Sequence, residues 1–360
     1  MAVIDRAAVA LAAAGGGRLL NPYMRIVFGA PAFAEGAELR SLPMAIAGRN
    51  IPNLHLHWPE YPLHGRLARR SAAATDVAYR LLVAAADRVR RRGGRVVWTA
   101  HNLAPHGFPS PHAAEAYARW APRLLARVDT VVAMSAFSAE AVRAALPAVA
   151  QARFVRIPHP HYRGVYCPAH AGDVRARHGI PAGAHLTVAA GLIRPYKGIP
   201  ALIAAFAAAA RDDEWLLVAG PCHDPAHRAE VERAAAAAPP RVRPRVRLAV
   251  GALDDAAFAG TLAAADLFAG NFGALLNSGS VLAALSLDTP VLAPRSEPLA
   301  ELAAEVGPEW LALFEPPLDA PGLRRALDAL REAPHGPRPD LTANEPEAVA
   351  RAHLPLYARP

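Results

Sequence analysis

Short runs of apolar and β-branched residues alternate along this chain with longer stretches rich in alanine, leucine and arginine. The short runs have the length of buried strands, and the longer stretches have the length and spacing of helices. The pattern predicts strands at Glu38–Leu42, Asn53–His57, Arg95–Thr99, Thr130–Met134, Phe154–Ile157, Leu186–Ala190, Trp215–Ala219, Val246–Val250, Asp266–Ala269, Pro290–Ala293 and Leu311–Phe314. It predicts helices at 71–91, 113–126, 137–147, 199–210, 254–264, 279–287, 297–305 and 320–332. A first strand near the N-terminus is too weakly marked to place.

Repeated alternation of strand and helix is typical of parallel sheets with helices on both faces. The segment 158–185, rich in proline, histidine and glycine, interrupts the alternation and divides the chain into two halves. Each half carries five or six strands, the content of one doubly wound domain. We therefore predict an α/β protein with two Rossmann-like domains, at residues 1–165 and 166–340. A final helix at 341–360 is predicted to pack back on the N-terminal domain.

Composition narrows the class of protein. Hydrophobic residues make up 53% of the 360 and charged residues 19%, which supplies sizeable cores and excludes extensive disorder. The formal net charge of +8 favours anionic partners such as nucleotides, phosphorylated substrates, lipid surfaces or nucleic acid. Two cysteines, Cys167 and Cys222, provide no disulfide framework, which suits a reducing cytoplasm.

Neither a secretory leader nor a membrane span is expected. The apolar run after Arg6 is dominated by small residues, and no secreted character follows it. No stretch reaches about 18 strongly apolar residues.

Unusual polar residues follow the predicted strands. In sheets of this kind, ligands bind beyond the carboxyl ends of the strands, so these residues are expected at the binding edge. They are His57, Glu60, His101, Asn102, His106, Ser135, His159, His161, Tyr162, Arg194, Tyr196, Lys197 and Asn271, with Asn277–Ser280 leading into a helix.

The stretch GLIRPYKG at Gly191–Gly198 suggests a binding site for an anion. Lys197 stands at a predicted helix start, where unpaired backbone N–H groups and the helix dipole already favour negative charge. Together with Arg194, it suits a diphosphate. The alternative is that both are solvated loop charges, which fits less well with their position between two glycines.

A second anion site is indicated at Asn277, Ser278, Gly279 and Ser280. Helix capping alone accounts for one of these residues. Four small residues in sequence suggest a nest of backbone and hydroxyl donors for a phosphate. The chain contains neither the P-loop pattern nor the GxGxxG dinucleotide fingerprint.

The histidines raise the question of a metal. The pattern His-x-His occurs at His55/His57 and His159/His161, but each pair lies where a strand gives way to a loop. The chain has no HExxH motif and no zinc-type spacing of cysteine and histidine. We therefore predict no metal site, a packed strand position for His55 and a cleft position for His101. His106 suits loop packing and the cleft equally well.

These residues resemble GT-B glycosyltransferases. The run from Gly191 through Lys197-Gly198 to Leu202–Phe206 is similar to the donor-binding segment of glycosyltransferase family 4. Further motifs resemble a bacterial branch that includes exopolysaccharide mannosyltransferases acting on lipid-linked sugars, and the likeness extends from Asn21 to Phe314. The motifs are Asn21-Pro22-Tyr23, His57-Trp58-Pro59-Glu60, Trp98-Thr99-Ala100-His101-Asn102 with Pro105-His106, and Asn277-Ser278-Gly279-Ser280 with Pro290-Val291.

The resemblance implies a GT-B fold, with two Rossmann-like domains facing across a cleft. It implies transfer of a hexose of mannose or glucose type from a nucleotide-diphosphate sugar, of GDP or UDP, to a hydroxyl group. The acceptor would be a glycan, a glycolipid or a small molecule, and neither a metal nor another cofactor would be needed.

The resemblance also implies roles for residues. Lys197 and Arg194 would hold the donor diphosphate, while Ser278, Gly279 and Ser280 would cradle its distal phosphate. His101 would lie near the donor sugar or acceptor hydroxyl, and Glu60 and His57 on the acceptor side. If the reaction inverts configuration, a general base is needed, and Glu60 and His101 are the candidates. Asn102, His106, His159, His161, Tyr162, Tyr196 and Asn277 are further cleft candidates.

The chain also departs from the family 4 pattern. The Glu-x7-Glu pair that supplies a ribose-binding carboxylate is replaced by Leu275 and Ala283. The arginine expected after the first loop glycine is Leu192, for which Arg194 is the substitute. We favour a different mode of donor binding over a degraded site, because the residues on the phosphate side remain.

Three other functions stay open. A nucleotide-sugar epimerase would need acidic residues in the cleft, where Glu60 is the only one of the clustered residues. A non-catalytic subunit would account for the missing glutamates. Nucleic-acid binding by the basic run Arg88–Arg95 is disfavoured because no aromatic residues are interleaved with it. Two other roles for this run are favoured instead: a solvated helix end, or contact with anionic lipid headgroups at the cytoplasmic face of a membrane.

Overall fold

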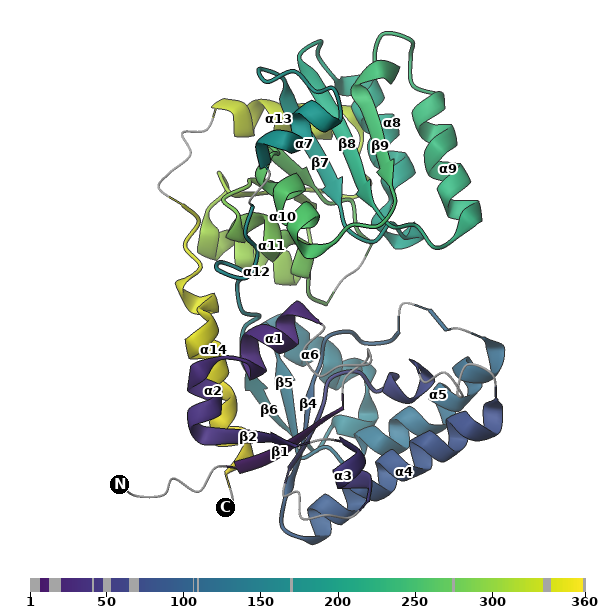
Figure 1. Cartoon of the computed structure of the whole chain (residues 1–360), viewed down its shortest axis with the longest axis vertical. Coiled ribbons are helices and arrows are strands. Elements are labelled where there is room, and N and C mark those ends of the chain that lie inside the picture. The colour runs from purple at the N-terminus through teal and green to yellow at the C-terminus, as the bar shows by residue number, and fades with distance from the viewer. Residues whose placement is uncertain are drawn as a thin grey trace. The chain divides into compact units, whose positions relative to one another are not determined.

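The computed structural model describes residues 7–12, 21–40, 42–47, 53–64, 71–105, 107–108, 110–168, 171–273, 276–332 and 338–358. The chain divides into two compact units (Figure 1). The N-terminal unit comprises Met1–Pro160 together with Ala343–Pro360, and the C-terminal unit comprises His161–Thr342. The chain therefore returns to its first unit after completing the second.

The N-terminal unit is built on a sheet of six parallel strands in the order β2-β1-β3-β4-β5-β6. Every residue of the central strands β3 and β5 is buried, whereas the edge strand β6 is partly exposed, as expected for a sheet covered on both faces. The strands are β1 (Ala7–Ala12), β2 (Ala37–Arg40), β3 (Asn53–Leu56), β4 (Arg95–Thr99), β5 (Thr130–Ala133) and β6 (Arg153–Arg156).

Helices pack in two groups around this sheet. The long helix α4 (Ala72–Arg91) packs on α3 (Leu42–Ile46) and α5 (Pro111–Leu125), while α6 (Ala136–Ala145) follows β5. In the other group, α14 (Pro346–His353) packs on α1 (Pro22–Phe28) and α2 (Pro31–Gly36), and Figure 1 shows α2 and α14 side by side.

The C-terminal segment is part of the core of the N-terminal unit. Val349 and Tyr357 are buried in one apolar cluster with Phe28. The backbone oxygen of Tyr357 accepts a hydrogen bond from Asn53 Nδ2 at 3.3 Å. These contacts tie the last residues of the chain to β3, a central strand of the sheet.

The C-terminal unit repeats the architecture with six parallel strands in the order β12-β11-β10-β7-β8-β9. Helices α8, α9 and α13 pack together, and α10 packs with α7 and α11 (Figure 1). The strands are β7 (His185–Ala190), β8 (Glu214–Gly220), β9 (Val246–Val250), β10 (Leu267–Ala269), β11 (Val291–Pro294) and β12 (Leu311–Phe314). The helices are α7 (Ala171–Arg177), α8 (Ile199–Ala209), α9 (Pro225–Ala236), α10 (Asp255–Ala263), α11 (Gly279–Ser286), α12 (Glu297–Val306) and α13 (Ala320–Glu332).

Strand order fixes where each unit can bind a ligand. Chain order reverses between β1 and β3 in the N-terminal sheet and between β7 and β10 in the C-terminal sheet. At such a reversal the connections leave in opposite directions and open a crevice at the carboxyl ends of the strands. His57 follows β3, and the loop bearing Lys197 follows β7.

Most predicted elements are present, including the strand at Leu311–Phe314 and the helix at 320–332. The strand β1 could not be placed from sequence, and α1, α2, α3, α7 and α9 were not among the predicted helices. In the described part of the chain, none of the helices combines the length and the apolar character needed to cross a bilayer.

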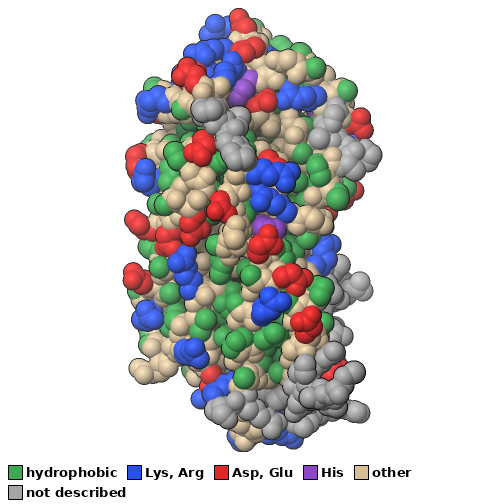
Figure 2. All heavy atoms as spheres, turned by 90° about the vertical axis from the view of Figure 1, so that its left-hand side faces the viewer, with side chains coloured by type: hydrophobic (Ala, Val, Ile, Leu, Met, Phe, Trp, Pro, Cys, Tyr) green, Lys and Arg blue, Asp and Glu red, His purple; other side chains and the backbone are tan. Residues whose placement is uncertain are grey.

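Charged side chains of both signs are interspersed on the face that bears α2 and α14 (Figure 2). Lysine and arginine do not gather there into a single patch among the described residues. The net positive charge of the chain is therefore not concentrated on that face.

A buried carboxylate anchors α13 to the sheet of the C-terminal unit. Glu214, at the start of β8, is fully buried. Its two oxygens accept hydrogen bonds from Arg324 at 2.8 and 2.9 Å and from Arg331 at 3.1 Å. Arg324 and Arg331 also pair with Asp328 and Asp213, so the carboxylate of Glu214 is the buried centre of a small ion-pair network.

Replacement of this carboxylate should destabilise the C-terminal unit. We expect Glu214→Leu to lower the free energy of unfolding by about 1–3 kcal/mol in urea titrations, because Arg324 and Arg331 lose their hydrogen bonds to a buried carboxylate but keep Asp328 and Asp213 as partners. Asp212→Asn is the matched control, since Asp212 also pairs with an arginine but its side chain is 97% exposed. It should change stability by less than about 1 kcal/mol. Equal effects of the two substitutions would contradict the role given to burial.

Candidate active site

The loop between β7 and α8 holds Lys197 in a defined conformation. A short 3-10 turn at Pro195–Lys197 ends at Gly198, whose φ of 56° is left-handed. A Cβ at Gly198 would lie 2.6 Å from Nδ2 of Asn271, so a larger residue would collide with the neighbouring loop. Glycine is therefore required here for both backbone conformation and close approach.

Backbone and amide hydrogen bonds attach this loop to its neighbours. The Ile193 N–H donates to Pro221 O at 2.8 Å, and the Gly273 N–H donates to Tyr196 O at 2.7 Å. The Asn271 side-chain amide donates to Gly198 O at 3.0 Å. Lys197 thus extends from a loop held by the segments that follow β8 and β10.

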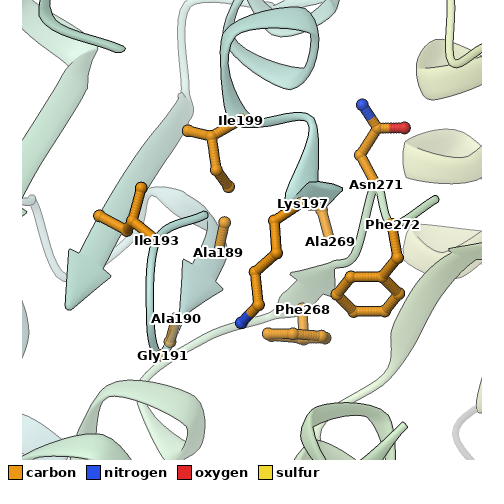
Figure 3. A pocket seen from close by; sticks show the side chains of 10 residues that line it. All are labelled: Ala189, Ala190, Gly191, Ile193, Lys197, Ile199, Phe268, Ala269, Asn271 and Phe272. Carbon is orange, nitrogen blue, oxygen red and sulfur yellow. The ribbon is translucent and has the colours of Figure 1, made fainter. Parts of the chain in front are cut away.

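Lys197 lies in a pocket at the carboxyl ends of β7 and β10, which we call the Lys197 pocket. Figure 3 shows the lysine chain crossing it, with Nζ beside Gly191. A Cβ at Gly191 would be 3.3 Å from that nitrogen, so the absence of a side chain there leaves room for the ammonium group. The pocket is lined by Ala189, Ala190, Gly191, Ile193, Lys197, Ile199, Phe268, Ala269, Asn271 and Phe272.

The electrostatics of the pocket favour an anion. Lys197 is the single lysine of the chain. All the other residues counted as Lys or Arg are arginines. Burial, with a smaller contribution from the charge of Arg194, lowers its pKa to about 8. In the described residues, neither Lys197 nor Arg194 forms an ion pair with a carboxylate. A partly buried cation without a protein counter-ion is stabilised by a bound anion.

The second predicted phosphate site lies at the start of α11. Ser278 is the N-cap residue, and its hydroxyl accepts a hydrogen bond from the Val281 N–H at 3.4 Å. Asn277, Gly279 and Ser280 are half-buried. The residues that line the Lys197 pocket include neither these four residues nor Arg194.

The N-terminal unit contains a group of five histidines, which we call the histidine cluster. They are His55, His57, His101, His159 and His353. His57 stacks on His55 with ring centroids 4.3 Å apart, and its Nδ1 lies 3.0 Å from Nε2 of His101. His353 comes from α14, so the C-terminal segment contributes to the cluster.

Aromatic rings enclose the outer part of the histidine cluster. Trp58 stacks on His101 with centroids 4.5 Å apart and 14° between the planes. The ring of Tyr23 meets both His101 and His159 edge-on, at 4.9 and 5.1 Å. The sequence motifs of residues 21–23, 57–60 and 98–102 therefore come together at the edge of one sheet.

Inside the cluster, His55 is held by two hydrogen bonds. Its Nδ1 lies 2.7 Å from the Tyr357 hydroxyl, and its Nε2 lies 2.8 Å from the Thr99 hydroxyl. His55 is fully buried within β3, the packed strand position predicted for it.

Burial keeps these imidazoles neutral. It lowers the pKa of His101 to about 3, with smaller contributions from His159 and His353. The pKa values of His159 and His353 fall to about 4, also through burial. Neutral rings can hydrogen-bond through one N–H and one lone pair, so the cluster is suited to orient polar groups rather than to attract anions.

Glu60 occupies a different environment three residues after His57. Burial raises the pKa of its carboxyl group above the usual value. Its charge also contributes to the raised pKa of the Tyr79 and Tyr117 phenols, after burial in both cases. A carboxylate with a raised pKa is better matched to accepting a proton near neutral pH.

The other predicted residues are distributed between the two units. Asn102 is half-buried in the loop after β4, and Tyr196 lies beside Lys197 in the β7–α8 loop. His161 and Tyr162 are buried in the C-terminal unit, where the Tyr162 N–H donates to the Ser286 hydroxyl at 2.9 Å. His106 and Leu275 lie outside the described residues. Over the described ranges, no group of three or more acidic, histidine or cysteine side chains could hold a metal ion.

Some residues of the two sites were not predicted. Phe272 lines the Lys197 pocket but was not singled out in the sequence. Asn271, by contrast, was expected at the binding edge because it follows a strand, and it both lines the pocket and holds its loop. Trp58 was part of a motif but received no role. His353 and Tyr357 carry no local signal, because they reach the cluster through the return of the C-terminal segment.

Comparison with known proteins identifies the family. No protein-family model matches the chain. The chain is 31% identical over 353 residues to the GDP-mannose:glycolipid 4-β-D-mannosyltransferase of Xanthomonas campestris pv. campestris, and the match covers 94% of this chain and 88% of that relative. A second sequence of the same name and species matches to the same extent. The chain belongs to this family of glycosyltransferases.

Solved structures agree on the fold of the glycosyltransferase. A sucrose-phosphate synthase from Thermosynechococcus elongatus superposes with a TM-score of 0.64 at 18% identity, covering 98% of this chain and 95% of the other. Anabaena HepE in complex with UDP and glucose gives 0.61 at 16%, covering 97% and 95%. WaaG, a glycosyltransferase of lipopolysaccharide biosynthesis, gives 0.57 at 17%, covering 98% and 97%. The predicted GT-B fold and the predicted hexosyl transfer from a nucleotide sugar to a hydroxyl group are confirmed.

The histidine cluster should make the stability of the glycosyltransferase depend on pH. His101, His159 and His353 have pKa values of about 3 to 4 in the folded protein, against about 6.5 when unfolded. The unfolded chain therefore binds more protons below pH 6.5, and stability falls as pH falls. We expect a loss of about 1 kcal/mol per pH unit for each histidine between pH 6.5 and pH 5, measured by urea unfolding.

The variant His353→Gln is the control for this effect, because it removes one of the titrating rings. Its stability should depend less steeply on pH over the same interval. An unchanged unfolding free energy of the parent protein between pH 7 and pH 5 would contradict burial of neutral histidines.

Proposed function

We propose that this glycosyltransferase moves mannose from GDP-mannose to a hydroxyl group of a glycolipid. The relatives that match almost the whole chain are named for this reaction. The Lys197 pocket, a cationic pocket at the carboxyl ends of parallel strands, is the observation that carries the assignment to a nucleotide-diphosphate donor.

In this proposal Lys197 and Arg194 bind the diphosphate. The leaving GDP gains negative charge in the transition state, and a fixed ammonium group in a pocket of low polarity stabilises it there. The low pKa of Lys197 follows from the same burial, and an arriving phosphate would raise that pKa and keep the group charged. Ser278–Ser280, at the N-terminus of α11, supply further donors for the distal phosphate.

A neighbouring cavity suits the nucleoside. It shares Phe272 with the Lys197 pocket and is lined as well by Gly273, Pro294, Arg295, Ser296, Leu299 and Pro316. Apolar walls with a few polar groups are typical of sites for a base and its ribose. Among the described residues that line this cavity none is acidic, which agrees with the replacement of the usual glutamate pair.

The stereochemistry of the proposed reaction requires a base. GDP-mannose carries its sugar in an α-linkage, so a β-linked product forms by inversion at the anomeric carbon. The acceptor hydroxyl must then lose its proton as it attacks the sugar. Glu60 and His101 are the two candidates for this step in the N-terminal unit, and the tautomeric state of His101 decides between them.

The single lysine allows a direct test of the donor site. An amine-reactive acetylating reagent should label Lys197, identified by peptide mass spectrometry, with a rate that rises through pH 8. GDP should protect Lys197 more than UDP, ADP or dTDP at equal concentration. Lys197→Met should lower kcat for transfer from GDP-mannose by about 10²–10³-fold, because one fixed stabilising charge is lost. Arg228→Met, on the exposed surface of α9, is the control and should retain parent activity.

Failure of every nucleotide to protect Lys197 would overturn the diphosphate site. Protection by UDP in preference to GDP would keep the site and reject the mannose donor. Parent-like turnover of Lys197→Met would show that the pocket takes no part in transfer.

We also propose that α4 contacts the membrane that holds a glycolipid acceptor. Val77 and Leu81 stand one helical turn apart and are 52% and 45% exposed. Arg80 and Arg91 are exposed on the same helix. Exposed apolar residues flanked by arginines suit the headgroup region of an anionic bilayer.

Sedimentation with lipid vesicles tests this contact. The enzyme should bind vesicles containing one quarter phosphatidylglycerol and should dissociate as salt is raised, whereas phosphatidylcholine vesicles should bind little. The double substitution Val77→Gln, Leu81→Gln should reduce the bound fraction several-fold, while Leu103→Gln, a matched exposed leucine outside the helix, should not. Equal binding by both variants would reject α4 as the contact surface.

A further inference from the structure

One ring nitrogen of His57 forms a hydrogen bond, and the other is buried without a hydrogen-bond partner among the described residues. Its side chain is 1% exposed. Its Nδ1 lies 3.0 Å from Nε2 of His101, but within the described chain Nε2 of His57 has no hydrogen-bond partner. The ring is stacked on His55 and meets the ring of Phe28 edge-on at 5.2 Å.

The two rings can share their hydrogen bond in two ways. Either His57 donates its Nδ1–H to Nε2 of His101, or His101 donates its Nε2–H to Nδ1 of His57. In the first arrangement, Nε2 of His57 carries no proton and is a buried acceptor without a donor. In the second, Nε2 of His57 carries the proton and is a buried donor without an acceptor. Buried N–H groups without an acceptor are rarer in proteins than unpaired buried acceptors, which favours the first arrangement.

A third arrangement, in which one of the two rings is a charged imidazolium, is excluded at neutral pH. Burial lowers the pKa of both rings far below the ordinary value, so neither becomes an imidazolium at neutral pH. The pair therefore holds one proton on each ring.

We propose that His57 is a positioning residue whose Nδ1–H fixes His101 in the tautomer protonated at Nδ1. Given the proposed function, His101 is then a hydrogen-bond donor to a hydroxyl oxygen of the transferred sugar or of its acceptor, and it is not the general base.

The chemical reason is the number of lone pairs. With Nε2 accepting from His57 and Nδ1 carrying the proton, the imidazole of His101 has no lone pair left to receive a proton from the acceptor hydroxyl. The base must be another group, and Glu60 is the remaining candidate of the N-terminal unit. A neutral donor held by a second ring orients a sugar oxygen without adding net charge.

Nitrogen-15 NMR tests the tautomers without any assay of activity. In uniformly labelled enzyme at pH 7, Nδ1 should be the protonated nitrogen of both His57 and His101, with the signals assigned from His57→Asn and His101→Asn. A proton on Nε2 of His57 would overturn the proposal whatever the enzyme transfers. Correct tautomers in an enzyme that transfers nothing from GDP-mannose would leave this inference standing and reject the proposed function.

Matched substitutions test the roles in catalysis. The amide nitrogen of asparagine can occupy the place of Nδ1–H, whereas leucine and alanine cannot donate. His57→Leu should lower kcat/KM about 10–100-fold, and His57→Asn should recover at least a tenth of the parent value. His101→Asn should likewise keep far more activity than His101→Ala. Asparagine cannot act as a base, so equal inactivity of the two His101 variants, with both folded, would contradict a donor role.

Discussion

Parallel pairing of the strands is the constraint on which both binding sites depend. In each unit every strand of the sheet runs the same way, so all carboxyl ends lie along one edge and every connection must cross the sheet to return. Loops after the strands are therefore collected at that edge, while the helices cover the apolar faces. Chemistry-bearing residues that are 44 positions apart, such as His57 and His101, meet because β3 and β4 are neighbours.

Burial of a cation organises the C-terminal site. The loop that carries Lys197 is held by backbone hydrogen bonds and by Asn271, so the position of the ammonium group does not depend on a carboxylate. A counter-ion from the protein would neutralise the group and compete with a phosphate. A lysine also suits this place better than an arginine, because its compact charge fits beside Gly191 and its pKa responds to burial.

The N-terminal site is organised in the opposite way, by neutral groups in an apolar enclosure. The C-terminal segment packs against the histidine cluster. It supplies His353 and the Tyr357 hydroxyl group, which hydrogen-bonds to His55. Hydrogen bonds between neutral rings are directional, so each ring constrains the proton of the next. An aromatic enclosure of this kind fixes the orientation of the rings, whereas the pocket of the other unit presents a largely buried positive charge.

The sequence alone determined the class of fold, most strands and the position of the Lys197 loop after a strand, because each of these follows from local properties of the chain. The spacing of apolar residues, the residues that begin helices and the glycines around Lys197 are all local properties of the sequence. Since ligands bind at the carboxyl ends of parallel strands, these local properties also predict where a binding site lies. Only the tertiary structure decided which of those residues meet. His57 pairs with His101 in the N-terminal unit, while His161 and Tyr162 belong to the C-terminal unit and are buried. His353 and Tyr357 join the cluster because a segment about 300 residues later in the chain packs against β3, and no local pattern of side chains encodes a contact over that distance.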